Sequence, residues 1–250
     1  MNFHVKVGLH PSFFNTLPAD MKTLFQLPLF GLALLLGCES QPTVASSSLT
    51  SGERRLCDSL RLDTSLVTFL RMYNASRLEP FQYSGYNIYK DGKVEPNPIH
   101  LSGVVFKEPY ATSTSLVERL YPTFHAKGYS VFVLEQHFNL QRKPDDLAIV
   151  KTPDKYTVIR YLQTDAGNYD ISNDSLVGLI QKLDARYSLD LIGAGSDWCE
   201  FVIRKEPADW LAFAKEVYAL CPDIVDQGTG TVEALAEEQK RTKHLYLWWD

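Results

Sequence analysis

The sequence lacks the short motifs that mark several large classes of enzyme. It contains no Gly-x-Ser-x-Gly nucleophile motif, no Gly-rich phosphate loop and no dinucleotide-binding fingerprint. It also has no basic run interleaved with aromatic residues, and its formal net charge is −5 at pH 7. Because a negative field repels phosphate backbones, we do not expect nucleic-acid binding. No motif defines a reaction or a cofactor.

Long hydrophobic runs are also lacking. The longest apolar stretch, from Leu24 to Leu36, is shorter than the roughly 20 residues that a membrane-spanning helix needs. It follows the basic start Met21-Lys22-Thr23, as the core of a signal segment does, and it ends in Leu35-Leu36-Gly37-Cys38. This ending resembles the bacterial lipobox, Leu-x-Gly-Cys.

The lipobox resemblance implies that Cys38 receives diacylglycerol on its sulfur and becomes the first residue of the mature chain. Residues 1–37 are then a signal segment, and translation is expected to start at Met21, because residues 1–20 contain no hydrophobic core. Residues 38–51 are rich in Ser and Thr and predict a flexible tether. In proteins with this signal, an Asp after the lipidated cysteine favours retention in the inner membrane, and this chain has Glu39 there. The resemblance therefore implies a protein that is anchored by its lipid in the outer membrane and faces the periplasm.

The remaining chain is long enough for one acidic domain, expected over residues 52–250. Residues 1–37 hold two of the 25 basic residues and one of the 30 acidic residues, so the mature chain has a net charge of −6. Only Cys57, Cys199 and Cys221 remain after lipidation, without metal-type spacing. At most one disulfide can form among them, its pairing is undefined, and buried free thiols are the favoured interpretation.

Helices are predicted where apolar residues recur at helical spacing. One helix lies somewhere within residues 52–78, and another, over 114–125, ends before Gly128. Three more are expected over 173–187 with Asn173 or Asp174 as cap, from Pro207 at the first position to about Leu220, and over 231–240.

Strands are predicted where β-branched and aromatic residues gather. A hairpin is expected from Tyr86–Tyr89 to Val94 around an Asp91-Gly92 turn. Runs 129–135, 147–151 and 155–163 predict a meander, and further strands are expected over 100–106, 189–194, 198–204 and 244–249. This order predicts an α+β fold with two layers, a mostly antiparallel sheet with helices packed mainly on one face.

The last part of the chain resembles a bacterial family known only as domain of unknown function 4253. The resemblance extends from about Gly128 to the C-terminus and implies no established activity. Members of the family often lack a lipobox, so the signal segment is a departure from it. The residues that carry the resemblance are Leu191-Ile192-Gly193-Ala194, Asp197-Trp198, Cys221-Pro222-Asp223, Gln227-Gly228 and Leu245-Tyr246-Leu247-Trp248-Trp249-Asp250.

The loop from Cys221 to Gln227 is the first candidate site. Asp223 and Gln227 are candidate binding residues, because loops on a rigid frame often carry binding. In a structural interpretation, which we favour, Asp223 caps a turn, Gln227 ties the loop backbone and Cys221 fills the core. A nucleophilic Cys221 with His244 as base would require the fold to bring the two together.

The C-terminus is the second candidate site. Alternation places Trp248 and Trp249 on opposite faces of the final strand, so one indole enters the core and the other, beside Asp250, forms a candidate binding surface or covers a loop. The histidines have no partner at a ligand spacing such as i, i+4, so a metal site is not expected. The scattered histidines are His100, His125, His137 and His244.

Two functions follow from these features. The favoured one is a non-catalytic, membrane-anchored binding or immunity-type protein with a protein partner, because the chain is small, acidic, tethered and without a catalytic motif. The alternative is a cell-envelope hydrolase that uses the Cys221 to Gln227 loop.

Overall fold

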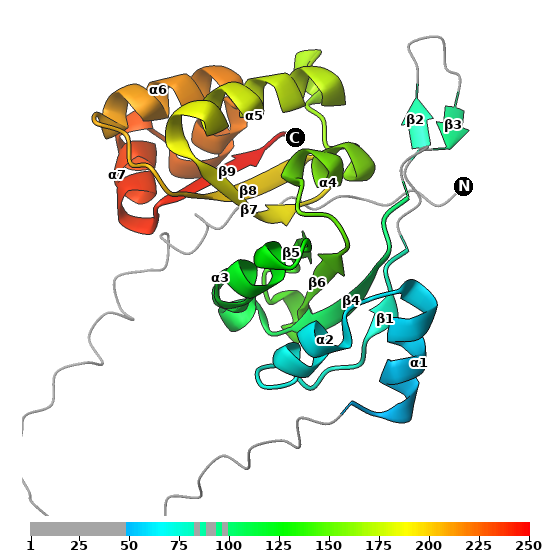
Figure 1. Cartoon of the computed structure of the whole chain (residues 1–250). Helices are drawn as coiled ribbons and strands as arrows, with labels where there is room; N and C mark the ends of the chain where they lie inside the picture. The colour runs from blue at the N-terminus through cyan, green and yellow to red at the C-terminus, as the bar shows by residue number, and fades with distance from the viewer. Residues whose placement is uncertain (1–48, 83–85, 89–93, 97–99) are drawn as a thin grey trace, which may run out of the picture.

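The computed structural model describes residues 49–82, 86–88, 94–96 and 100–250 (Figure 1). The expected signal segment, Cys38 and most of the expected tether lie outside these residues. Leu49 is buried, and Thr50 caps helix α1 (Ser51–Leu60) in a capping box with Glu53. The fold therefore begins before Gly52 and takes in the last residues of the expected tether. In the described part of the chain, no helix is both long and apolar enough to cross a membrane.

One sheet runs through the molecule in the order β1-β4-β6-β5-β7-β8-β9. Neighbouring strands are antiparallel except β5 and β7, which are parallel. The expected α+β class with a mostly antiparallel sheet is confirmed. The strands are β1 (Glu79–Pro80), β4 (Gly103–Glu108), β5 (Ser130–Glu135), β6 (Asp145–Val150), β7 (Leu189–Ala194), β8 (Trp198–Ile203) and β9 (His244–Trp248). Separately, β2 (Tyr86–Ile88) pairs antiparallel with β3 (Val94–Pro96), as expected for the predicted hairpin. The predicted Asp91-Gly92 turn lies outside the described residues.

Helices cover both faces of this sheet. One core cluster joins α1, α2 (Thr64–Leu70) and α3 (Tyr110–Ala126) to Val131 and Val133 of β5. The other joins α4 (Lys155–Leu162), α5 (Asn173–Tyr187), α6 (Trp210–Leu220) and α7 (Val232–Thr242) to Phe132 of the same strand. Because successive residues of a strand point to opposite faces, the two clusters lie on opposite sides. The sheet is thus the middle of three layers. The sequence predicted two layers, because helical periodicity does not show which face of a sheet a helix covers. Figure 1 shows α5 and α6 over β7 to β9, with α1 and α2 at the other end of the molecule.

The predicted third strand of the meander is wrong, because residues 155–162 form helix α4. Asp154 caps this helix by accepting the backbone N–H groups of Tyr156 and Thr157. The buried residues Val158, Ile159, Tyr161 and Leu162 follow a helical spacing. The β-branched composition of the segment suggested a strand, but the cap and the core contacts decide its conformation.

The predicted start of α6 and the predicted cap of α5 are wrong. Helix α6 begins at Trp210, because Asp209 accepts the N–H groups of Leu211 and Ala212, and Pro207 lies before the helix. Helix α5 is capped by Ser172. The side chain of Asn173 instead donates to backbone carbonyls of Ile159 and Thr164 and ties α5 to α4.

Shorter helical segments complete the chain. They are η3 (Leu140–Arg142), η4 (Gly167–Tyr169) and the π-helix η5 (Ile224–Thr229). The last of these contains most of the Cys221 to Gln227 loop.

Candidate functional site

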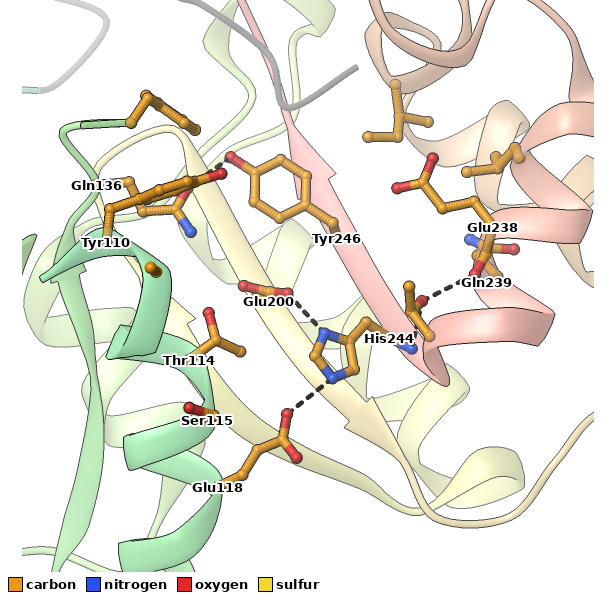
Figure 2. A pocket seen from close by; sticks show the side chains of 15 residues that line it. Tyr110, Thr114, Ser115, Glu118, Gln136, Glu200, Glu238, Gln239, His244 and Tyr246 are labelled. Carbon is orange, nitrogen blue, oxygen red and sulfur yellow. Dashed lines mark hydrogen bonds and ion pairs between the residues drawn. The ribbon is translucent and has the colours of Figure 1, made fainter. Parts of the chain in front are cut away.

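A cleft of about 460 Å³ opens between α3, the β8–β9 pair and α7 (Figure 2). Its walls come from segments far apart in the sequence: the first turns of α3, the residues that follow β5, the outer face of β8 and β9, and one side of α7. The lining is rich in carboxylate, amide, hydroxyl and aromatic side chains. The main ones are Tyr110, Thr114, Ser115, Glu118, Gln136, Glu200, Glu238, Gln239, His244 and Tyr246.

His244 lies in this cleft between two carboxylates. Its Nδ1 is 2.8 Å from Oε1 of Glu200, and its Nε2 is 3.0 Å from Oε1 of Glu118. Glu200 and His244 are neighbours on one face of the antiparallel β8–β9 pair, where Glu200 is paired with Tyr246. Glu118 reaches the ring from α3 (Figure 2).

The two carboxylates determine the protonation of the ring. Burial works to lower the pKa of His244, but the hydrogen bonds and charges of Glu200 and Glu118 outweigh it, so the pKa is raised above its ordinary value of 6.5. Ionised carboxylates only accept hydrogen bonds, so the two contacts favour the protonated ring, the imidazolium, in which both nitrogens donate. In that form the ring has no free lone pair with which to take a proton from a substrate.

The cleft has an excess of negative charge. Glu238 of α7 lines the same cleft, so its lining holds three carboxylates and one imidazole, of which Glu118 and Glu200 contact the imidazole. Gln239 is only 2% exposed, and in the described part of the chain neither its amide nitrogen nor its amide oxygen has a hydrogen-bond partner. An unpaired buried amide costs about 1–3 kcal/mol, so this wall contains polar groups that the fold itself does not use.

Cys221 is not available as a nucleophile. It is fully buried, its Sγ donates to the carbonyl of Trp248 at 2.9 Å, and burial raises its pKa to about 12. It packs with Leu245 and Leu247 in the core on one side of β9, whereas the ring of His244 lies on the other side. The fold does not bring the predicted nucleophile and base together. Cys57 and Cys199 are buried as well, and all three thiols are free.

Asp223 joins three separate segments. It accepts hydrogen bonds from the hydroxyl of Tyr169 at 2.6 Å, from Nε2 of Gln227 at 3.0 Å and from the backbone N–H of Asp250 at 3.0 Å. It is 4% exposed. Its oxygens are occupied by the fold, which supports the structural interpretation of the Cys221 to Gln227 loop over a binding one.

The two C-terminal tryptophans lie as the strand alternation predicted. Trp249 is buried in the core, where its Nε1 donates to the carbonyl of Leu220 at 3.2 Å. Trp248 is half-buried and packs against the cluster on the other face. Asp250 is exposed. Neither Trp248 nor Asp250 lines the cleft.

A second polar cluster lies next to the cleft. Each of Glu135, His137 and Asp146 has one potential metal-ligand atom that lies within 4.8 Å of those of the other two. The histidine spacing did not indicate this cluster, because Asp146 is brought to Glu135 by the pairing of β6 with β5.

The comparison with protein families assigns the C-terminal part of the chain. Residues 146–250 match a family model described as Domain of unknown function (DUF4253). The C-terminal part of the chain is a DUF4253 domain. No curated protein and no solved structure matches the chain.

The DUF4253 domain begins later than the expected Gly128. Its first residue lies in β6, so β4 and β5, which flank that strand, come from the preceding part of the chain. The lining of the cleft likewise comes partly from this domain and partly from the preceding residues. The domain supplies Glu200, Glu238 and His244, while Glu118 comes from α3 outside it.

The motifs that carried the resemblance are explained by packing. A Cβ on Gly193 would lie 2.5 Å from the indole of Trp198, and one on Gly195 would overlap the same ring. Trp198 in turn stacks on Tyr246 at a centroid distance of 5.9 Å. With Asp223 and Trp249, these residues hold the β7–β8 hairpin, the η5 loop and β9 in place around the cleft.

Proposed function

We propose that this protein is a lipid-anchored, non-catalytic binding protein of the bacterial cell envelope, whose cleft holds a cationic side chain of a protein partner. The observation that supports this best is the excess of carboxylates over cationic groups in the lining of the His244 cleft. A partner with an exposed Lys or Arg fits, as a basic toxin would that an immunity-type protein neutralises.

Charge and shape both favour a cationic group. The imidazolium of His244 offsets one of the three carboxylates Glu118, Glu200 and Glu238, so a net negative charge remains in a half-enclosed space. Such a charge orients a cationic partner and speeds its association. Tyr110 and Tyr246 add aromatic rings to the wall, and a guanidinium or ammonium group is attracted to an aromatic face.

The hydrolase alternative has less support. A hydrolase of the predicted kind, with Cys221 as nucleophile and His244 as base, needs an accessible thiol and a base with a free lone pair. The thiol of Cys221 is buried and protonated, Asp223 is occupied by internal hydrogen bonds, and each ring nitrogen of His244 contacts a carboxylate. Binding requires none of these groups to be free.

The envelope location rests on the lipobox and on Cys38, which lies outside the described residues. Replacing Cys38→Ser in bacteria fed radioactive palmitate should abolish labelling of the protein and leave the precursor uncleaved. Label incorporated into the Ser variant would refute the lipid anchor.

The cleft is tested by titration of the full-length protein with N-acetyl-arginine amide, followed through the imidazole signals of His244 by NMR. The neutral isostere N-acetyl-citrulline amide is the ligand control. We expect the arginine derivative to shift the His244 signals and Glu238→Gln to weaken its binding by about tenfold, which corresponds to about 1.4 kcal/mol.

Glu237→Gln is the matched protein control, because Glu237 is the preceding residue of α7 and is exposed outside the cleft. It should bind as the unchanged protein does. Equal binding of the arginine and citrulline derivatives, or equal losses in the Glu237 and Glu238 variants, would contradict a cation-binding cleft.

A further inference from the structure

Glu135, His137 and Asp146 form a compact group at the end of the β5–β6 pair. Nε2 of His137 is 3.5 Å from Oδ2 of Asp146, and Nδ1 of His137 is 3.6 Å from Oε1 of Glu135. None of the three side chains lines the His244 cleft. These three side chains therefore form a site separate from the cleft.

His137 is buried, and one of its ring nitrogens makes no hydrogen bond within the described residues. The side chain is 8% exposed, and in the described part of the chain Nε2 has no hydrogen-bond partner. A buried nitrogen without a partner is a cost to the fold, because it loses its bond to water and gains none in return. This nitrogen faces the carboxylate of Asp146, where a cation would satisfy both groups.

The surrounding contacts hold the potential ligands in place. Asp145, which is fully buried, accepts the backbone N–H of His137 at 2.7 Å through Oδ1 and the hydroxyl of Ser113 at 2.7 Å through Oδ2. Lys107 binds Oδ1 of Asp146 at 2.5 Å and leaves Oδ2 toward His137. Such supporting bonds are typical of the residues around metal ligands.

We propose that Glu135, His137 and Asp146 bind a divalent first-row transition metal ion, with Zn²⁺ as the representative ion. Two ligand atoms of a tetrahedral zinc ion lie about 3.4 Å apart, which matches the His137 to Asp146 separation. Glu135 is 62% exposed and can rotate to complete the set. One imidazole and two carboxylates favour such an ion over Ca²⁺ or Mg²⁺, which prefer oxygen ligands alone.

A metal ion here would clamp the segment that follows β5 to strand β6. That segment has an unusual backbone, because Phe138, Asn139, Gln141 and Arg142 all have positive φ angles of 50° to 59°. Gln136, between two of the ligands, and Phe138 line the cleft. The ion would thus fix one wall of the cleft without touching its contents.

The test is a Zn²⁺ titration of the full-length protein after treatment with a chelator, measured by competition with a chromogenic zinc indicator. We expect one ion per chain, a rise in melting temperature on binding, and nitrogen and oxygen but no sulfur around the ion by X-ray absorption. Loss of a residue that only hydrogen-bonds a metal ligand already weakens metal binding by about 10- to 100-fold, so loss of the ligand itself in His137→Gln should weaken it by at least about 100-fold.

Two further variants distinguish loss of the metal site from a general effect on folding or on histidine content. Glu135→Gln changes an exposed side chain, so it should leave the metal-free melting temperature unchanged while weakening Zn²⁺ binding by about tenfold or more. His125→Gln removes an exposed histidine of α3 and should bind Zn²⁺ as the unchanged protein does. No bound ion, sulfur ligands, or unchanged affinity in both the Glu135 and His137 variants would overturn the proposal.

Discussion

Nδ1 of His244 lies 2.8 Å from Oε1 of Glu200, and the two residues face the cleft from paired strands. This contact makes the stability of the protein depend on pH. Although burial opposes it, the pKa of His244 in the folded protein is raised above the ordinary value of 6.5 by Glu200 and Glu118. The stabilisation is therefore complete below about pH 6.5 and is lost as the pH rises through the folded pKa.

His244→Gln should remove this dependence. Urea unfolding of both proteins across the neutral to alkaline range should show the largest difference in free energy at the acidic end and a smaller one as the pH rises. His125→Gln, which changes an exposed histidine, is the matched control. A His244 difference that grows toward alkaline pH would mean that the ring is neutral in the folded state.

Gly195 lies against the indole of Trp198, where a Cβ would overlap the ring. Gly195→Ala should therefore destabilise the protein by about 1–3 kcal/mol, since the β7–β8 hairpin or the indole must shift. Gly178 in α5 has no atom near the position of a Cβ, so Gly178→Ala should stabilise by about 0.5–1 kcal/mol through helix propensity. Urea unfolding measures the change in the free energy of unfolding for each variant. Equal changes in the two variants would show that the contact with Trp198 does not require glycine at position 195.

Local signals in the sequence predicted much of the fold. The pairing of the two hairpin strands, the helix that ends before Gly128 at φ +83 and the alternation of the final strand were all correctly interpreted. These features depend on neighbours within a few residues. Helix α4 was missed because its β-branched residues favour a strand locally, while the Asp154 cap and the core contacts favour a helix.

The cleft was not predictable in the same way. His244 meets Glu200 across 44 residues and Glu118 across 126 residues, and no local pattern encodes such a contact. One signal was present: Glu200 is a charged residue within the otherwise apolar strand Trp198–Ile203. A buried carboxylate needs a partner, so its position indicated an ion pair or a site, although not which residue would provide the contact.

A substitution of Asp223 tests whether the Cys221 to Gln227 loop has a structural or a catalytic role. Its carboxylate accepts from Tyr169, Gln227 and the backbone of Asp250. Asp223→Asn keeps the size but replaces one accepting oxygen with an N–H₂ group, which faces donors that it cannot satisfy. Because the site is buried, we expect a loss of about 1–3 kcal/mol in the free energy of unfolding, measured by urea denaturation.

Asp226→Asn is the matched control for this substitution. Asp226 lies in the same η5 segment but is exposed, and its one side-chain contact in the described structure is with the hydroxyl of Tyr218 at 3.1 Å. Its replacement should change stability by no more than about 0.5 kcal/mol. Active-site groups are often held at the expense of stability, so a catalytic Asp223 would instead give a neutral or stabilising Asn variant. That result, together with loss of a cellular phenotype, would favour the hydrolase over the binding protein.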